Sequence, residues 1–379
     1  EKALLKAEID VDNGKIVSIP SLSFDKFDFN LQGKIAFNKN QQVTTIDISG
    51  IRAPKTAAKA KIEFAYKPKE KVKINISGTS YDLSALFAQK ENTKPKNSKN
   101  IKNTKKLSRP KKEDILKNVT DTDINIAVNN LWTSEKSMIK NFAGSAKLVN
   151  GIGIKEMHLV GNFTSSPHSY LRLNYVPHAN KEYLLDIDSN DAGNTLRFLR
   201  LYDNMKGGRL NMSARRDKNK DFVGHAKIRD FSVHNTPVLA KLLTVASFTG
   251  MVNLLTGEGV KFSHFDAPFT YSDQILSVKE AKTFGNVLGI TANGSYDLYY
   301  DDIDISGVVA PAYSLNSFIG KIPLVGNLLS GKDGTVFAAN YKIKGNIEDP
   351  QISLNPLSAL SPSSLKDMLS SVFGGDNGK

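Results

Sequence analysis

The chain has 379 residues, no cysteine and a formal net charge of +13 at pH 7. That length allows two or three ordinary domains or one extended repetitive domain. A hydrophobic content of 40% excludes wholesale disorder. The absence of cysteine excludes a disulfide framework, a thiolate metal site and a cysteine nucleophile.

Residues 1–89 form an N-terminal region in which apolar and polar residues alternate. Leu5, Ala7 and Ile9 alternate with charged residues, and similar stretches follow. Successive side chains of a strand point to opposite faces, so this pattern predicts strands with one apolar and one polar face. The sequence Asp-Asn-Gly at Asp12–Gly14 predicts a type I′ hairpin turn. Because the first residues are neither a signal peptide nor a presequence, we expect this region to continue a longer repetitive β-sheet.

A basic run occupies residues 90–118 and separates the N-terminal region from the rest. Residues 90–117 hold eleven Lys or Arg against three acidic residues, a net charge of +8, so only +5 remains elsewhere. The run lacks apolar periodicity, which favours a disordered, solvated loop. Attraction to anionic lipid head groups is a second interpretation. Nucleic-acid binding is the least favoured, because the run has no aromatic residue to stack on bases.

The remaining residues, 119–379, continue the strand pattern and add a few helices. Periodicity, capping residues and glycine stops predict helices near 192–202, 237–255, 312–331 and 361–373. The segment 237–255 is apolar, but it contains Lys241 and Asn253. A membrane span needs about 20 mostly apolar residues, so we expect short packed helices there.

Strand after strand without long intervening helices predicts an antiparallel meander of roughly 18–20 strands. A sheet of that size must hide its apolar face. It can pair with a second sheet, close as a barrel or curl into a gutter. The alternation pattern leaves these three arrangements open.

Catalytic and metal-binding motifs find little support. The segment Gly326–Asp333 approaches a P-loop but has Asp333 where that motif needs Ser or Thr, and it lies between a predicted helix and a strand in the wrong order. No Gly-x-Ser-x-Gly sequence occurs. Isolated polar residues in turns or on the polar face of a strand are poor metal ligands: His158, His168, His178, Asp301, Asp302 and Asp304. We therefore predict no enzyme, no cofactor and no metal site.

A pattern of glycine, proline and apolar positions in the C-terminal two thirds resembles a known family. The segments that carry it are Asp191–Gly208, Asp230–Leu243, Val308–Gly320, Lys321–Gly331, Val336–Gly345 and Asp349–Ser358. Their order resembles the AsmA-like C-terminal domain of large envelope proteins in diderm bacteria, from about Asp123 to Phe373. The resemblance contains no catalytic residues, so it bears on fold more than on chemistry.

The resemblance implies an all-β fold: a long twisted antiparallel sheet curled into a taco-like groove, with a few short capping helices near the C-terminal end. It also implies a segment of a bridge-like protein that carries phospholipids across the periplasm, anchored to the inner membrane through a part outside this chain. The C-terminal helices would cap the groove or meet a membrane. The candidate groove residues alternate toward one face, and a bulge would reverse the assignment on any strand: Leu159, Leu173, Ile187, Met212, Ile228, Phe269, Ile290, Ile303, Ile305, Phe337, Tyr341 and Ile343.

An alternative function remains open at this point. The same sheet could serve outer-membrane assembly as a structural factor that binds envelope proteins by strand-edge pairing. A continuous lipid-width groove would favour lipid transport, whereas a filled core would favour the structural role.

Overall fold

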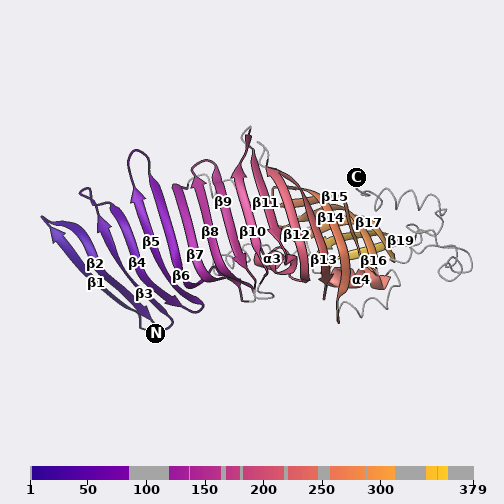
Figure 1. The fold of residues 1–379 in the computed structure, drawn as a ribbon, viewed down its shortest axis with the longest axis horizontal. Helices are drawn as coiled ribbons and strands as arrows, with labels where there is room; N and C mark the ends of the chain where they lie inside the picture. Colours follow the sequence, from indigo (N-terminus) through magenta and orange to yellow (C-terminus); the bar gives the residue numbers. More distant parts are fainter. Residues whose placement is uncertain are drawn as a thin grey trace, which may run out of the picture. The chain divides into compact units, whose positions relative to one another are not determined.

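The computed structural model describes residues 2–84, 119–135, 137–163, 168–179, 182–216, 221–245, 257–286, 288–311, 339–347 and 349–356. Its 19 strands are assigned to one open sheet of mixed strand direction, and the described residues include two short helices (Figure 1). The predicted all-β class is therefore confirmed. The chain divides into two compact units within β11, at Ile187/Asp188.

Unit 1 contains a run of consecutive strands, each hydrogen-bonded to the next from β1 to β10. The ten strands are β1 (Leu4–Asp12), β2 (Lys15–Lys26), β3 (Phe29–Phe37), β4 (Val43–Ala53), β5 (Thr56–Ala65), β6 (Lys71–Asp82), β7 (Asp121–Ser134), β8 (Ser137–Val149), β9 (Gly153–Asn162) and β10 (Leu171–Pro177). Strand β11 (Tyr183–Ser189) follows and contains the boundary between the two units. The β1–β2 turn has positive φ at Asn13 and Gly14, as the predicted type I′ turn requires.

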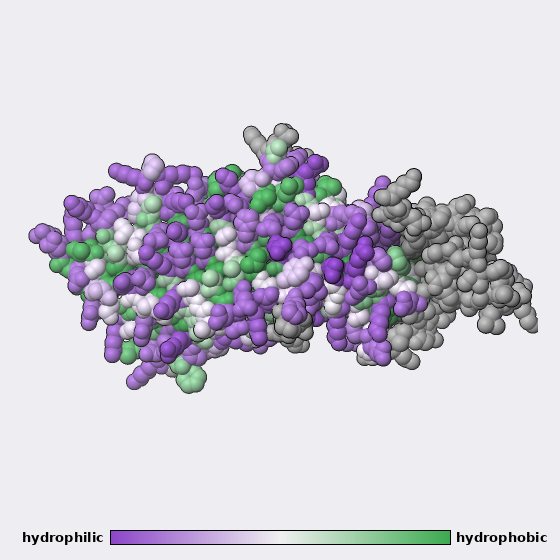
Figure 2. Space-filling view, viewed as in Figure 1, coloured by the Kyte–Doolittle hydropathy of each residue, from purple (hydrophilic) through white to green (hydrophobic). Residues whose placement is uncertain are grey.

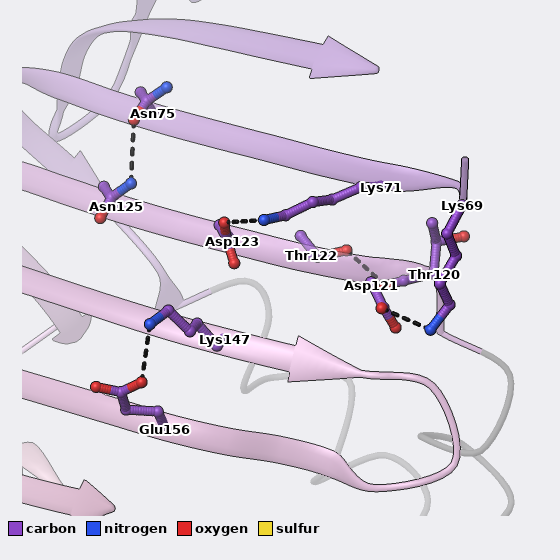
Figure 3. Close-up of polar contacts among 10 residues, drawn as sticks. All are labelled: Lys69, Lys71, Asn75, Thr120, Asp121, Thr122, Asp123, Asn125, Lys147 and Glu156. Carbon is purple, nitrogen blue, oxygen red and sulfur yellow. Dashed lines mark hydrogen bonds and ion pairs between the residues drawn. The ribbon is translucent and has the colours of Figure 1, made fainter. Parts of the chain in front are cut away.

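One pair departs from the predicted antiparallel meander, because β6 and β7 run parallel. Strand β7 therefore runs in the same direction as β6. On the polar face of this seam Lys71 pairs with Asp123 at 2.6 Å, and the Asn125 amide donates to Asn75 at 3.1 Å (Figure 3). Polar side chains thus join the two strands along part of their length.

Unit 2 contains a second run of antiparallel strands, paired consecutively from β12 to β19. They are β12 (Met205–Arg216), β13 (Phe222–Val233), β14 (Val260–Ser272), β15 (Ile275–Phe284), β16 (Leu288–Asp297), β17 (Asp302–Pro311), β18 (Ala339–Asn346) and β19 (Gln351–Pro356). The helices are α3 (Ala192–Phe198) and α4 (Pro237–Val245). They lie where helices near 192–202 and 237–255 were predicted, whereas 312–331 and 361–373 fall outside the described residues.

The sheet of unit 2 is strongly curved. Helix α4 follows β13, yet it contacts β19, which is six strands further along the sheet. Adjacent strands rotate by about 20–25° on average, so six steps rotate the strand direction by roughly 120–150°. Figure 1 shows this change of strand direction from β12 to β19. The twist brings the turn between β18 and β19 toward the end of β13, and α4 lies between them.

Both described helices have capping residues that fix their first turn. The Asp191 carboxylate accepts a hydrogen bond from the Asn194 backbone N–H at 3.0 Å, which caps α3. In α4, Pro237 occupies the first helical position and the Ala240 N–H donates to the Thr236 carbonyl. In the described part of the chain, no helix has the length and apolar character that a membrane span requires.

Candidate apolar binding face

Unit 1 has an apolar row that crosses its strands without a gap. Ile35 on β3 pairs with Ile46 on β4, and the pairing continues strand by strand to β7. Residues directly opposite one another in a sheet share a face, so these side chains form one line perpendicular to the strands. We call this line the isoleucine row; its members are Ile35, Ile46, Ile62, Ile74 and Ile124.

A second apolar row runs beside the isoleucine row, two residues along each strand. Its members are Ile48, Ala60, Ile76, Ile126, Gly144, Leu159 and Leu173. On β5 the residues from Ala58 to Phe64 alternate onto the same face, a length of about 20 Å at 3.4 Å per residue. The two rows therefore form an apolar band that is wide as well as continuous.

The isoleucine row is only half-buried, although its members are large and apolar. All five side chains keep part of their surface accessible. Further along unit 1 the burial increases, and Val128, Phe142 and Leu173 are each 4% exposed. Accessible apolar surface of this face thus includes the isoleucine row, and it extends to β1, where Leu5 shares the face through Phe24 and Leu31 and is 65% exposed.

The opposite face of unit 1 is polar. Lys61 pairs with Glu63 at 2.7 Å. Lys147 pairs with Glu156 at 2.9 Å (Figure 3). Hydrogen bonds with Asn174 and Glu156 raise the pKa of His158, which lies on this face. Figure 2 shows mainly hydrophilic residues on the visible side, with apolar residues between them. The two faces of the sheet therefore differ sharply in chemistry, as the alternation predicts.

The predicted groove residues of unit 2 share one face. Cross-strand pairing puts Phe269, Ile305 and Ile343 on a single row, while the other members lie on rows two or four residues away along the strands. We call this face the inner face of unit 2; it carries Met212, Ile228, Phe269, Ile290, Ile303, Ile305, Tyr341 and Ile343. The strand pairing keeps these side chains on one common face, despite irregular register in β14 and β15.

Burial divides the predicted groove residues into two sets. Met212, Phe269, Ile290 and Ile305 are half-buried, as is Leu159 in unit 1. The others are packed, with exposures of 4–7%: Leu173, Ile187, Ile228, Ile303, Tyr341 and Ile343. Phe337 lies outside the described residues. The packed side chains are less available to a ligand than those of the isoleucine row.

The isoleucine row was absent from the sequence-based list of groove residues. Its signal was present, because the segments around Ile62, Ile74 and Ile124 alternate clearly. The resemblance covers only the chain from about Asp123 onward, so the groove residues it implies do not include those of β3–β6. Half-exposure of these residues is a property of the folded sheet and has no marker in the sequence.

Polar groups on the described surface form pairs on open strand faces. His225 contacts Asp266 at 2.7 Å across β13 and β14, with both side chains partly exposed. Within the described ranges, no group of three or more His, Asp or Glu side chains is arranged to hold a metal ion. The site supported best by the geometry is therefore the apolar band of unit 1.

Comparisons with models of protein families, with curated proteins and with solved structures found no match to this chain.

Proposed function

We propose that this chain is a segment of a lipid-transport protein, in which the apolar band shields phospholipid acyl chains from water. The single observation that supports this most is the isoleucine row, which crosses β3–β7 unbroken and stays half-buried. A sheet face that served only as a packed core would bury such residues. Here they remain accessible while the opposite face is charged.

The dimensions of the band suit acyl chains. A bilayer's hydrocarbon core is about 30 Å thick, so one layer of acyl chains spans about 15 Å. The band on β5 is about 20 Å wide by strand geometry. Each buried CH₂ contributes about 0.8 kcal/mol, so shielding needs no specific contact. Head groups would remain in water at the edge of the band.

The row also offers a path for movement. Neighbouring strands are about 4.8 Å apart, and each step along the row meets another isoleucine. An acyl chain that moves one strand along therefore exchanges one apolar neighbour for an equivalent one. Passive movement of lipid along the sheet follows from this repetition.

The cellular setting of the proposal comes from the resemblance to the AsmA-like family. That resemblance implies a chain in the periplasm of a diderm bacterium, as part of a larger protein anchored to the inner membrane. Phospholipids are its cargo, and no enzymatic step is proposed. Other envelope proteins are possible partners in that setting.

Site-specific photo-crosslinking tests the proposal directly. A photoreactive amino acid replaces Ile62 or Ile124 in the apolar row, or Lys61 or Asn125 on the polar face as the matched neighbours. The protein is irradiated in a diderm host, and adducts are identified by mass spectrometry. We expect phospholipid adducts at Ile62 and Ile124 and none at Lys61 and Asn125.

Two other outcomes would contradict the proposal. The absence of lipid at all four positions in a folded protein would remove the support for transport. Protein adducts at Ile62 and Ile124 in place of lipid would favour the assembly role instead. Ile62 and Ile124 are better probe positions than the packed Leu173 and Ile303, because a ligand can reach their side chains.

A further inference from the structure

Helix α4 is placed across the curved sheet of unit 2. It starts directly after β13 and touches β19, so it links two strands that lie far apart in the sheet. In a curved sheet, the line joining two distant strands passes on the concave side. The inner face is the more buried side of β12 and β18, so it is the concave one. Helix α4 therefore lies at an end of the inner face.

The helix is held mainly by apolar packing. Leu239, Leu242 and Leu243 occupy one stripe and are 9%, 3% and 0% exposed. Spacing of three and four residues puts them on the same side of a helix. Thr236, just before the helix, shares a hydrogen bond with the Tyr202 hydroxyl at 2.8 Å, which fixes the start of α4. Helix α4 is therefore anchored at its N-terminal end, next to Thr236, and packed along the side that carries the three leucines.

The far side of the helix is attached by a weaker polar contact. The Lys241 ammonium pairs with the Asp349 carboxylate at 3.0 Å and donates to the Pro350 carbonyl at 3.1 Å. Both partners of the ion pair are largely exposed, and pairs of this kind contribute about 0–1 kcal/mol. The buried leucine stripe thus contributes more to holding α4 in place than the polar contact does.

Apolar contacts of this kind can be exchanged for acyl chains. A leucine side chain that leaves the interior of unit 2 loses its packing, but hydrocarbon from a lipid would fill the same space with similar chemistry. The free-energy cost of moving α4 is therefore lower with lipid present than in water alone. The ion pair adds only a small, reversible attachment at the moving edge.

We propose that α4 is a lid over the inner face of unit 2, anchored at Thr236, and that entering acyl chains displace it from β19. This proposal depends on the proposed lipid function, and it adds a second lipid-binding region, in unit 2, whose access α4 controls. The open band of unit 1 accepts lipid without a lid movement. The half-buried Ile305 on the inner face reports lipid entry into unit 2.

The absence of cysteine makes a clean test possible. Lys241→Cys and Asp349→Cys are introduced together and joined by a short bismaleimide, which ties α4 to the turn before β19. The matched control joins Asp304→Cys to Lys344→Cys, an ion pair between β17 and β18 that does not involve α4. A photoreactive amino acid at Ile305 or at Ile62 then reports adducts with phosphatidylethanolamine and phosphatidylglycerol vesicles.

The expected result is loss of lipid adducts at Ile305 when α4 is tied, with adducts at Ile62 unchanged. Tying β17 to β18 should change neither signal. Equal adducts at Ile305 with α4 tied, or no adducts there even with α4 free, would overturn the lid while Ile62 still reports lipid. The absence of adducts at Ile62 as well would instead refute the proposed lipid function.

Discussion

At the scale of single residues, a glycine allows close packing between three strands of unit 2. Gly307 on β17 lies opposite Tyr341, whose hydroxyl donates to the Thr291 carbonyl at 2.6 Å. A Cβ at Gly307 would collide with the Thr291 backbone and approach the Tyr341 hydroxyl. Burial raises the pKa of Tyr341, so its hydroxyl stays protonated and remains a donor.

Gly307→Ala should destabilise unit 2 by about 1–3 kcal/mol, because the clash is with backbone atoms that cannot rotate away. Gly50→Ala is the matched control: it also lies in a strand, and a Cβ there would meet nothing within 4 Å. We expect that control to change stability by less than about 0.5 kcal/mol. Denaturant unfolding of both variants measures the difference, and equal effects would contradict the packing argument.

At the scale of elements, the strands could largely be predicted from the sequence, but their pairing could not. The alternation around Ile62 and Ile74 predicts strands in either direction, because parallel and antiparallel neighbours share the same period. The parallel β6–β7 seam was therefore missed. The isoleucine row was also beyond prediction as a row, since register shifts such as that between Ile48 and Ile51 move the pairing by a residue.

Helix α4 gives a prediction at this scale. Leu243→Ala should cost about 2–5 kcal/mol in the stability of unit 2, because Leu243 is fully buried. Lys241→Ala on the same helix should cost less, about 1–2 kcal/mol at most, because it removes an exposed ion pair and one hydrogen bond to the Pro350 carbonyl. Thermal unfolding measured side by side tests the contrast. A larger effect for Lys241→Ala would mean that the polar contact holds the helix.

At the scale of the whole molecule, charge and apolar surface occupy different parts of the chain. Most of the net positive charge lies in residues 90–117, while several charged residues of the unit 1 sheet pair with one another. Clustered cations attract anionic membrane surfaces, each contributing about 1 kcal/mol near the surface. The basic run is thus the strongest candidate for electrostatic membrane attraction.

Replacing the Lys and Arg residues from Lys94 to Lys112 with Gln should reduce binding to anionic vesicles and leave binding to zwitterionic vesicles unchanged. Salt should weaken the binding of the original chain in the same way, because it screens the attraction. Vesicle sedimentation measures both effects. The control replaces the paired Lys61, Lys71 and Lys147 instead. An equal loss in the control would show that net charge matters and its position does not.

The parallel seam between β6 and β7 also bears on how the protein is made. Each antiparallel pair from β1 to β6 closes through a connection of a few residues, so those strands can pair as soon as they are synthesised. Strand β7 arrives only after residues 83–120, and until then β6 exposes an unpaired edge. Such an edge can pair with any available strand. During biogenesis, the interval between these two strands is when unit 1 is most exposed to aggregation and most in need of a chaperone.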